Sequence, residues 1–265
     1  MTVAFVTGGG RGVGRVIAES LAAEDFAVGV AARTTVEVEE TATAIEGSGG
    51  RVLALTVDAT DRTSVESALA TAERRLGAID VLVNNAGSAR AIGPVWGVDP
   101  EEWWQDVESS LRSAFLCSRA VLPRMLERGT GRILNVSSYV ALRPTPYISG
   151  YAAAKAALLS LTEALAASVG DTDVRVFAVT PGRFHSELMR HLMDSEAGKR
   201  WLPGIGEGGR WVEPERVAQL IVFLATGKGD ELNGRFLHAL DDLDELVERA
   251  DEIVRDDLFT PRLRR

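Results

Sequence analysis

Cysteine, histidine and lysine are scarce in this chain of 265 residues, which has one cysteine, three histidines and three lysines. A single cysteine excludes an internal disulfide and suits a reducing compartment. We expect Cys117 to be a small buried hydrophobic residue on a helix. His185, His191 and His238 are not spaced like metal ligands, and no cysteine or acidic cluster joins them. No metal site is therefore predicted.

Acidic residues outnumber basic ones, and long apolar runs are absent. The net charge is −9, which argues against a nucleic-acid surface and against binding to anionic membranes. No apolar run approaches the roughly 20 residues that span a bilayer. No basic, apolar and small-residue leader is visible, so no signal peptide is expected. Together with the single cysteine, these absences indicate a cytoplasmic protein with no nucleic-acid or membrane partner.

What is present is an alternation of short apolar stretches with longer amphipathic segments, from the first residues to about residue 240. Their β-branched residues predict strands that are buried on both faces. No linker rich in Pro, Gly or Ser divides the chain, so we predict one α/β domain with a doubly wound parallel sheet. The predicted strands are Val3–Val6, Ala27–Ala31, Val52–Val57, Val81–Val83, Ile133–Val136, Val174–Val179 and Phe236–Ala239.

A glycine-rich loop follows the first predicted strand and precedes a predicted helix, Arg15–Ala23. It contains Gly8, Gly12 and Gly14, which allow the backbone to approach a pyrophosphate closely and to turn into the helix. The free N–H groups at the start of the helix favour an anion. This strand-loop-helix context predicts dinucleotide binding.

A second stretch combines Ser138, Tyr151 and Lys155. Tyr151 and Lys155 are one helical turn apart and share a face of the predicted helix. An ammonium beside a phenol favours the phenolate, so we expect Lys155 to lower the pKa of Tyr151. The tyrosine would then donate or accept a proton near neutral pH, and the Ser138 hydroxyl could bond to the same reacting oxygen.

These motifs resemble those of the classical short-chain dehydrogenase/reductase family in order and spacing, over residues 1 to about 238. The resemblance implies a Rossmann-like sheet of about seven strands, a nicotinamide cofactor, and hydride transfer between a carbonyl and an alcohol. The motifs that carry it are Thr7-Gly8-x-x-x-Gly12-x-Gly14, Asn84-Asn85-Ala86-Gly87, Ser138, Tyr151-x-x-x-Lys155 and Pro181-Gly182.

The resemblance also implies roles for individual residues. Tyr151 would be the general acid/base, Lys155 would lower its pKa and hold the nicotinamide ribose, and Ser138 would position the substrate oxygen. Asp58 would bind the adenine amino group, or else cap the next helix. The residues expected to contact the cofactor are Gly8, Arg11, Gly12, Val13, Gly14, Arg33, Asp58, Asn85, Ala86, Gly87, Tyr151, Lys155, Pro181, Gly182 and Ser186. For Ser186, a bond to the nicotinamide carboxamide and a helix cap are equally compatible with the sequence.

The charge at the end of the second strand predicts which nicotinamide cofactor is used. An acidic residue there would bind a ribose 2′-hydroxyl and repel a 2′-phosphate, but Ala32 is neutral and Arg33 is a planar phosphate-binding group. Arg11 in the glycine loop could reach the same phosphate. We therefore predict NADP(H) over NAD(H); the alternative is that both arginines are solvated surface residues.

The sequence departs from the family at Ser110, where the family commonly has an active-site asparagine that holds a water molecule. That water links the lysine to solvent as a proton relay. A serine hydroxyl can donate and accept, but it is shorter and has one polar atom instead of two. Either Ser110 holds the water with altered geometry and completes the catalytic set, or the relay is damaged and turnover is slow.

Two further segments differ in expected role from the nucleotide-binding and catalytic domain, residues 1–240. Residues 183–213 hold apolar side chains between glycines and suit a lid over an apolar substrate; His185 in this lid could face substrate or solvent. Residues 241–265 begin with acidic residues and predict an extra amphipathic helix to about Arg255. We expect it to pack at the interface of a homo-oligomer, a tetramer or a dimer.

The sequence thus predicts an NADP(H)-dependent oxidoreductase that interconverts a ketone or aldehyde and an alcohol, with Tyr151 as general acid/base. One alternative keeps the fold and reduces a β-ketoacyl thioester. Another is a cofactor-binding protein with little turnover, which only Ser110 favours.

Overall fold

Seven parallel strands form one sheet in the computed structural model, which describes residues 1–262. The strand order is β3-β2-β1-β4-β5-β6-β7, so the predicted doubly wound fold with about seven strands is confirmed. The strands are β1 (Val3–Thr7), β2 (Ala27–Ala32), β3 (Val52–Thr56), β4 (Val81–Asn84), β5 (Thr130–Val136), β6 (Asp173–Thr180) and β7 (Phe236–His238).

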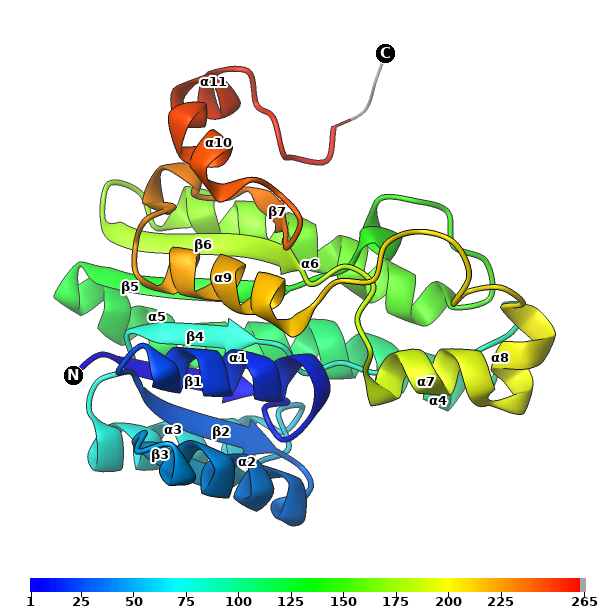
Figure 1. Ribbon diagram of the computed structural model, residues 1–265, viewed down its shortest axis with the longest axis horizontal. Coiled ribbons are helices and arrows are strands. Elements are labelled where there is room, and N and C mark those ends of the chain that lie inside the picture. Colours follow the sequence, from blue (N-terminus) through cyan, green and yellow to red (C-terminus); the bar gives the residue numbers. More distant parts are fainter. Residues whose placement is uncertain (263–265) are drawn as a thin grey trace.

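Helices cover both faces of the sheet (Figure 1). The long helices are α1 (Gly12–Ala23), α2 (Thr35–Gly47), α3 (Arg62–Leu76), α5 (Ser113–Arg128), α6 (Ser149–Ser168) and α9 (Pro214–Ala225). Shorter ones are α4 (Pro100–Val107), α7 (Glu187–Asp194), α8 (Glu196–Trp201), α10 (Leu243–Glu248) and α11 (Ala250–Arg255). One apolar core lies between the sheet and α1, α2 and α9, and a second lies between the sheet and α3, α5 and α6. Cys117 is buried in the second core, as expected, and burial raises the pKa of its thiol to about 12.

Strand β1 pairs with both β2 and β4, so the chain reverses its winding direction beside β1. Crossover connections leave a crevice at such a point, outside the carboxyl ends of the strands. This topology places the glycine-rich loop after β1 and the Asn84-Asn85-Ala86-Gly87 segment after β4 next to each other.

Between α4 and α5 the helix passes through a π-helical turn, η1 (Glu108–Arg112). The helix begins at Pro100, where the Asp99 carboxylate caps it by accepting from the amides of Glu101 and Glu102. A π-helical turn is an insertion that often lies at functional sites. Here it contains Ser110, which is 1 % exposed.

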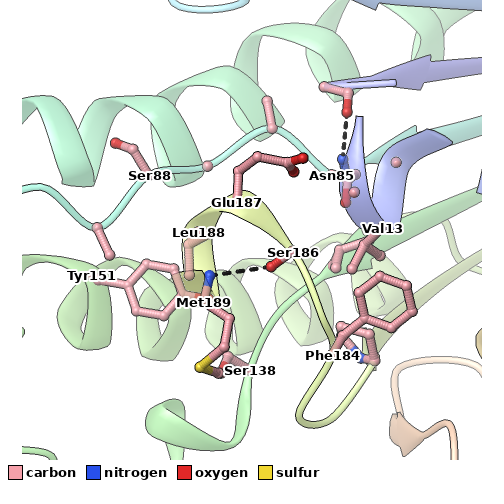
Figure 2. Close-up of a pocket in the computed structure, with 18 of the residues that line it drawn as sticks. Val13, Asn85, Ser88, Ser138, Tyr151, Phe184, Ser186, Glu187, Leu188 and Met189 are labelled. Atoms are coloured by element: carbon pink, nitrogen blue, oxygen red, sulfur yellow. Dashed lines mark hydrogen bonds between the residues drawn. The ribbon is translucent and has the colours of Figure 1, made fainter. Parts of the chain in front are cut away.

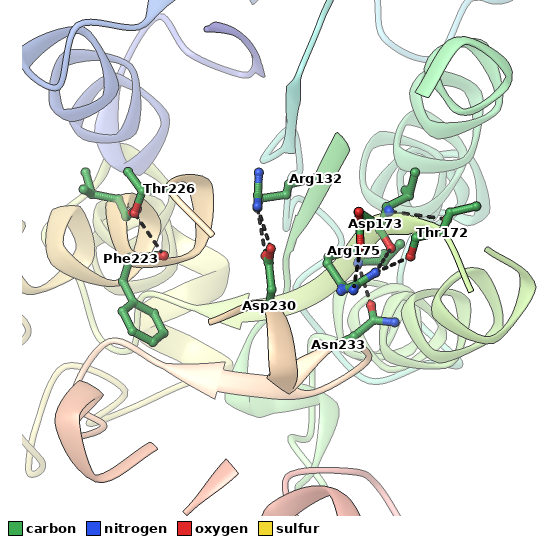
Figure 3. A network of polar contacts seen from close by, with 11 residues as sticks. Arg132, Thr172, Asp173, Arg175, Phe223, Thr226, Asp230 and Asn233 are labelled. Atoms are coloured by element: carbon green, nitrogen blue, oxygen red, sulfur yellow. Dashed lines mark hydrogen bonds and ion pairs between the residues drawn. The ribbon is translucent and has the colours of Figure 1, made fainter. Parts of the chain in front are cut away.

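A polar network joins the amino ends of the last strands (Figure 3). The Arg132 guanidinium donates to both carboxylate oxygens of Asp230, at 2.8 and 2.6 Å. The Asn233 side chain accepts from the Val176 amide at 2.8 Å. These bonds tie the short 3-10 turn η3 (Asp230–Leu232), which precedes β7, to β5 and β6. They lie at the amino ends of the strands, away from the cavity described below.

The C-terminal extension packs against its own chain. Its expected single helix is interrupted at Arg249, which separates α10 from α11. Leu246, Ala250 and Ile253 are buried in the core shared with α9. The amide of Phe236 in β7 donates to the Phe259 carbonyl at 2.9 Å. The buried face of the extension therefore stabilises its own subunit, and only its outer face is available to another one.

None of the helices within residues 1–262 has both the length and the apolar character needed to cross a bilayer. The same residues hold no group of three or more His, Cys, Asp or Glu side chains placed to bind a metal ion.

Candidate active site

A cavity of about 1060 Å³ opens at the carboxyl ends of the strands (Figure 2). Loops after β1, β2, β3, β4, β5 and β6 line it, together with α7. It brings together nearly all the residues that the sequence predicted to act: Gly8, Arg11, Gly12, Val13, Gly14, Arg33, Asp58, Asn85, Ala86, Gly87, Ser138, Tyr151, Lys155, Pro181, Gly182 and Ser186. Ser110 is the exception and lies behind the wall of the cavity.

The glycines of the loop after β1 pack closely against their surroundings. Gly8 and Gly12 have φ angles of +63° and +54°, in the region that favours glycine. A Cβ on Gly14 would collide with the Gly8 carbonyl oxygen. The loop is therefore a tight backbone cradle that opens onto the first turn of α1. This cradle fits the pyrophosphate of a dinucleotide, which needs close backbone approach and helix N–H groups.

Two asparagines at the end of β4, Asn84 and Asn85, hold the sheet and the cradle. The Asn85 side chain donates to the carbonyl oxygens of Thr7 and Gly8, both at 3.0 Å. The Asn84 side chain donates to the side chains of Asn135 at 2.8 Å and Ser118 at 3.1 Å in the buried centre of the sheet. Asn85 thus fixes the shape of the glycine loop, whereas Asn84 links β4 to β5 and α5.

Tyr151 and Ser138 meet at the floor of the cavity. Burial raises the pKa of Tyr151, a hydrogen bond with Ser138 opposes that rise, and the charge of Asp106 adds to it. The expected lowering of this pKa by Lys155 is therefore wrong for this structure. The reason is that removal of the phenol from water disfavours the phenolate more than its neighbours stabilise it.

Lys155 lies under the Tyr151 ring, with its ammonium 5.6 Å from the ring centroid. It is 3 % exposed, and its Nζ donates to the Val136 carbonyl at 2.7 Å. Burial lowers the pKa of Lys155 to about 8. The lysine is consequently close to the point where it can release or take up a proton near neutral pH.

Ser110, which lies behind the cavity wall, and Lys155, which lines the cavity, both approach Gly87. A Cβ on Gly87 would lie 2.9 Å from Ser110 Oγ and 3.3 Å from Lys155 Nζ. Ser110 Oγ is buried and has no hydrogen-bond partner among the described residues. The hydroxyl that replaces the expected asparagine thus lies beside Gly87, as the lysine ammonium does, and its hydrogen-bonding capacity is unused by the described residues.

The far end of the cavity carries the two predicted phosphate-binding arginines. Arg33 is exposed; burial acts to raise the pKa of Asp58, but hydrogen bonds from Thr60 and then the charge of Arg33 lower it. Arg11 is not simply solvated, because its Nη1 pairs with Glu37 Oε1 at 3.2 Å. Sequence reasoning missed Glu37, since it considered only the strand end and not the side chains that α2 turns toward the loop.

The sequence left two residues with alternative roles, Asp58 and Ser186, each as a helix cap or as a ligand contact. Asp61, not Asp58, caps α3 by accepting from the Ser64 amide at 2.7 Å. Asp58 instead accepts from the amide and hydroxyl of Thr60 and faces the cavity. Ser186 caps α7 by accepting from the Met189 amide at 3.2 Å. Its hydroxyl proton stays available to a ligand, so the cap and a ligand contact are compatible.

Asp106 is a further site residue that sequence reasoning missed. Its buried carboxylate accepts from the Ser88 hydroxyl at 2.7 Å and from the amides of Arg90 and Ala91 at 2.8 to 3.0 Å. It therefore fixes the loop after β4 that lines the cavity. In the sequence Asp106 is simply an acidic residue within a predicted helix, and such residues face solvent in most helices.

His238 and Glu187 also line the cavity, although the sequence did not predict a role for them there. His238 Nδ1 accepts from the Leu240 amide at 2.8 Å, so the neutral ring carries its proton on Nε2; burial lowers its pKa. Glu187 Oε2 lies 3.3 Å from the position of a Cβ on Gly12, beside the glycine loop. The position of His238 at the carboxyl end of the last strand could have drawn attention to it.

The segment expected to form the lid, 183–213, contains α7 and α8. Leu188, Met189, Leu192 and Ile205 line the cavity and give it an apolar wall. His185 does not line the cavity; its ring stacks on Trp211 at 3.9 Å between centroids. His185 thus has a packing role, and no part in the candidate site.

The site agrees with the proteins that this chain resembles. The family profile described as "short chain dehydrogenase" matches residues 2–197. A short chain dehydrogenase of Monascus purpureus is 36 % identical, over 98 % of this chain and 87 % of its own. A 3-oxoacyl-acyl-carrier-protein reductase of Escherichia coli is 34 % identical, over 89 % of this chain and 94 % of its own.

Among solved structures, a variant of actinorhodin polyketide ketoreductase with NADPH superimposes with a TM-score of 0.81. It is 29 % identical, and the match covers 89 % of this chain and 95 % of that one. The sheet order, the glycine cradle beside α1 and the near-complete profile match lead to one assignment. The chain belongs to the classical short-chain dehydrogenase/reductase family and is an NAD(P)-dependent oxidoreductase.

Proposed function

We propose that this enzyme uses NADP(H) to interconvert an apolar ketone or aldehyde and the corresponding alcohol, with Tyr151 as the general acid/base. The convergence of Tyr151, Ser138 and Lys155 at one end of a single large cavity carries this proposal. NADPH would supply the hydride that reduces the carbonyl carbon. Everything else in the reaction concerns the oxygen of that carbonyl, which the side chains of this protein bind and protonate.

In the reducing direction Tyr151 donates its phenolic proton to the substrate oxygen. A pKa raised by burial keeps the phenol protonated before the reaction, which suits an acid. Ser138 bonds to the same oxygen and stabilises the negative charge that develops on it. The Lys155 ammonium, with its pKa of about 8, stabilises the phenolate that is left and can return a proton to it.

Ser110 would extend this proton path beyond Lys155. Its hydroxyl and the lysine ammonium meet beside Gly87, and the hydroxyl has no protein partner among the described residues. A water molecule held between the two groups would complete a relay. This is the first of the two interpretations left open by the sequence.

The preference for NADP(H) is supported by charge. Arg33 follows β2 and Arg11 follows β1, on the opposite side of β4 from β5 and the Ser138 loop, where the adenosine of a cofactor seated on the glycine cradle would lie. A guanidinium binds phosphate oxygens in a bidentate manner. The related actinorhodin ketoreductase was solved with NADPH.

A β-ketoacyl thioester is the second candidate substrate. It is favoured by the likeness to the 3-oxoacyl-acyl-carrier-protein reductase, which covers 89 % of this chain. The apolar wall formed by Leu188, Met189, Leu192 and Ile205 suits an acyl chain as well as a free ketone. A cofactor-binding protein with little turnover is the third, and only the Ser110 substitution favours it.

Titration of the protein with NADPH and with NADH, followed by cofactor fluorescence, tests the proposal. We expect NADPH to bind more tightly, and Arg33→Ala to weaken NADPH binding much more than NADH binding. Equal losses for both cofactors would refute the NADP(H) preference. Tyr151→Phe should then bind NADPH normally but lose carbonyl reduction by about 100-fold or more; retained turnover would refute the role of Tyr151.

A further inference from the structure

The Arg11–Glu37 ion pair lies inside the rim of the candidate cofactor cavity, where both residues contribute to the lining. Arg11 belongs to the glycine loop, whereas Glu37 comes from the first turn of α2. The pair is therefore formed by the two elements that would enclose the adenosine ribose of a cofactor seated on the cradle. The inference below rests on the proposed NADP(H) binding.

Helix α2 packs closely against the glycine loop, and this keeps the backbone of Glu37 next to Arg11. A Cβ on Gly10 would lie 2.7 Å from the Glu37 Cβ, so only glycine allows this approach. One turn further along α2, the Thr41 hydroxyl donates to the Gly10 carbonyl at 3.1 Å. These contacts hold the backbone of Glu37 beside the loop, and only its side chain can rearrange.

A 2′-phosphate at this end of the cavity would meet a carboxylate as well as a guanidinium. A phosphate monoester carries a charge of about −1.5 to −2 at neutral pH, so it is attracted by Arg11 and repelled by Glu37. NAD(H) has a neutral hydroxyl at the same position and leaves the ion pair undisturbed. The carboxylate thus acts against one cofactor and is indifferent to the other.

We propose that Glu37 is a specificity-determining residue that competes with the 2′-phosphate of NADP(H) for Arg11 and so limits the preference for NADP(H) over NAD(H). When the phosphorylated cofactor binds, Arg11 turns from Glu37 to the phosphate. With the unphosphorylated cofactor, Arg11 stays paired with Glu37. Arg33, which has no carboxylate within salt-bridge distance among residues 1–262, supplies attraction in the first case only.

The test compares Glu37→Gln with Glu40→Gln. Both variants remove one negative charge from α2, but Glu40 is exposed and does not line the cavity. Dissociation constants are measured for NADPH and NADH by fluorescence, and for adenosine 2′,5′-bisphosphate and 5′-AMP by calorimetry. The two fragments carry the 2′-phosphate difference without the nicotinamide, so they report on this end of the cavity alone.

We expect Glu37→Gln to tighten NADPH and the bisphosphate by about threefold to fivefold, a size typical of exposed charge pairs. NADH and 5′-AMP should bind as before, and Glu40→Gln should change none of the four. In an Arg11→Ala background the effect of Glu37→Gln should shrink, because the two side chains compete through Arg11. Equal tightening of all four ligands, or no tightening of NADPH, overturns the proposal.

The failure of this inference can be told apart from the failure of the proposed function. If the unmodified enzyme prefers NADPH and Arg33→Ala removes that preference, the proposed function stands whatever Glu37→Gln does. If Glu37→Gln instead weakens NADH and 5′-AMP, the carboxylate binds the ribose hydroxyl. That result overturns the competition proposal, and with a preference of the unmodified enzyme for NADH it overturns the NADP(H) proposal too.

Discussion

Ser110 Oγ and Lys155 Nζ approach the same point beside Gly87, although the two residues belong to different helices. The π-helical turn η1 carries Ser110 and α6 carries Lys155. Because Gly87 has no side chain, both polar atoms can lie close to the position that a Cβ on Gly87 would occupy. The relationship gives the serine a defined place next to the candidate catalytic lysine.

Removal of the Ser110 hydroxyl should therefore slow proton transfer without affecting cofactor binding. We expect Ser110→Ala to lower kcat by about tenfold and to leave the NADPH dissociation constant unchanged, since general acid–base assistance is worth about 100-fold or more when complete. Ser110→Asn should keep or raise kcat, because an amide offers a second polar atom. Steady-state rates and fluorescence titration check both; a severe loss in a folded Ser110→Asn protein would contradict the relay.

Lys155 should make stability depend on pH in a defined window. Its pKa is lowered from 10.5 to about 8, so between these values the unfolded chain binds a proton that the folded chain does not. Stability contributed by this group then rises with pH across the window, by a total of about 3 kcal/mol. The free energy of unfolding of the native protein, minus that of Lys155→Met, should increase from pH 8 to pH 10.5. A flat difference in urea titrations would show that the lysine is not buried as described.

Asp106 should act on the substrate side by positioning the loop after β4. Asp106→Asn removes the charge that accepts bonds from Ser88, Arg90 and Ala91. We expect a loss of about 1 to 3 kcal/mol in unfolding free energy and a rise in KM of about fivefold to tenfold, with a smaller change in kcat. Ser88→Ala, which deletes one of these donors, should show the same pattern more weakly. A fall in kcat at constant KM would contradict a positioning role.

The two faces of the C-terminal extension should respond differently to truncation. Ile253 is fully buried and its neighbour Val254 is 46 % exposed. Ile253→Ala should cost about 2 to 5 kcal/mol, whereas Val254→Ala should stay within about 0.5 kcal/mol. Urea midpoints measure both; equal small effects would mean that the extension does not pack on its own subunit.

The homo-oligomer predicted from the sequence is checked by the mass in solution. Several large apolar side chains are exposed on α4 and α5, among them Trp104, Phe115 and Leu126. Burial of such a surface stabilises association, so we expect light scattering to give twice or four times the mass of 28.4 kDa. A monomeric mass would refute the prediction.

The strands and the glycine cradle could be predicted because their sequence patterns are local. Runs of β-branched residues mark buried parallel strands, and glycines at Gly8, Gly12 and Gly14 are required by backbone geometry at their own positions. The predicted strand bounds were too short where the apolar pattern was shorter than the strand. Strand β5 starts at Thr130, before the apolar residues that begin at Ile133, because main-chain pairing continues through polar residues.

Other parts of the site depend on contacts between distant segments. The position of Glu37 follows from the packing of α2 on Gly10, and that of Asp106 from the loop it caps. The direction of the Tyr151 pKa depends on how deeply the phenol is buried, which no local motif reports. The break between α10 and α11 likewise follows from packing of the extension on the core, since the sequence reads as one amphipathic helix.

The bond from the Phe236 amide to the Phe259 carbonyl has a consequence for how this protein can associate. Strand β7 ends the sheet, and such a strand normally presents unpaired amides that recruit strands from other chains. Here the amide of Phe236 is taken by Phe259, the amide of His238 by the Asp241 carboxylate, and the His238 carbonyl by the Asp241 amide. The tail therefore closes this side of the sheet to intermolecular β-pairing. It guards the protein against edge-to-edge aggregation and leaves helical surfaces as the means of assembly on this side.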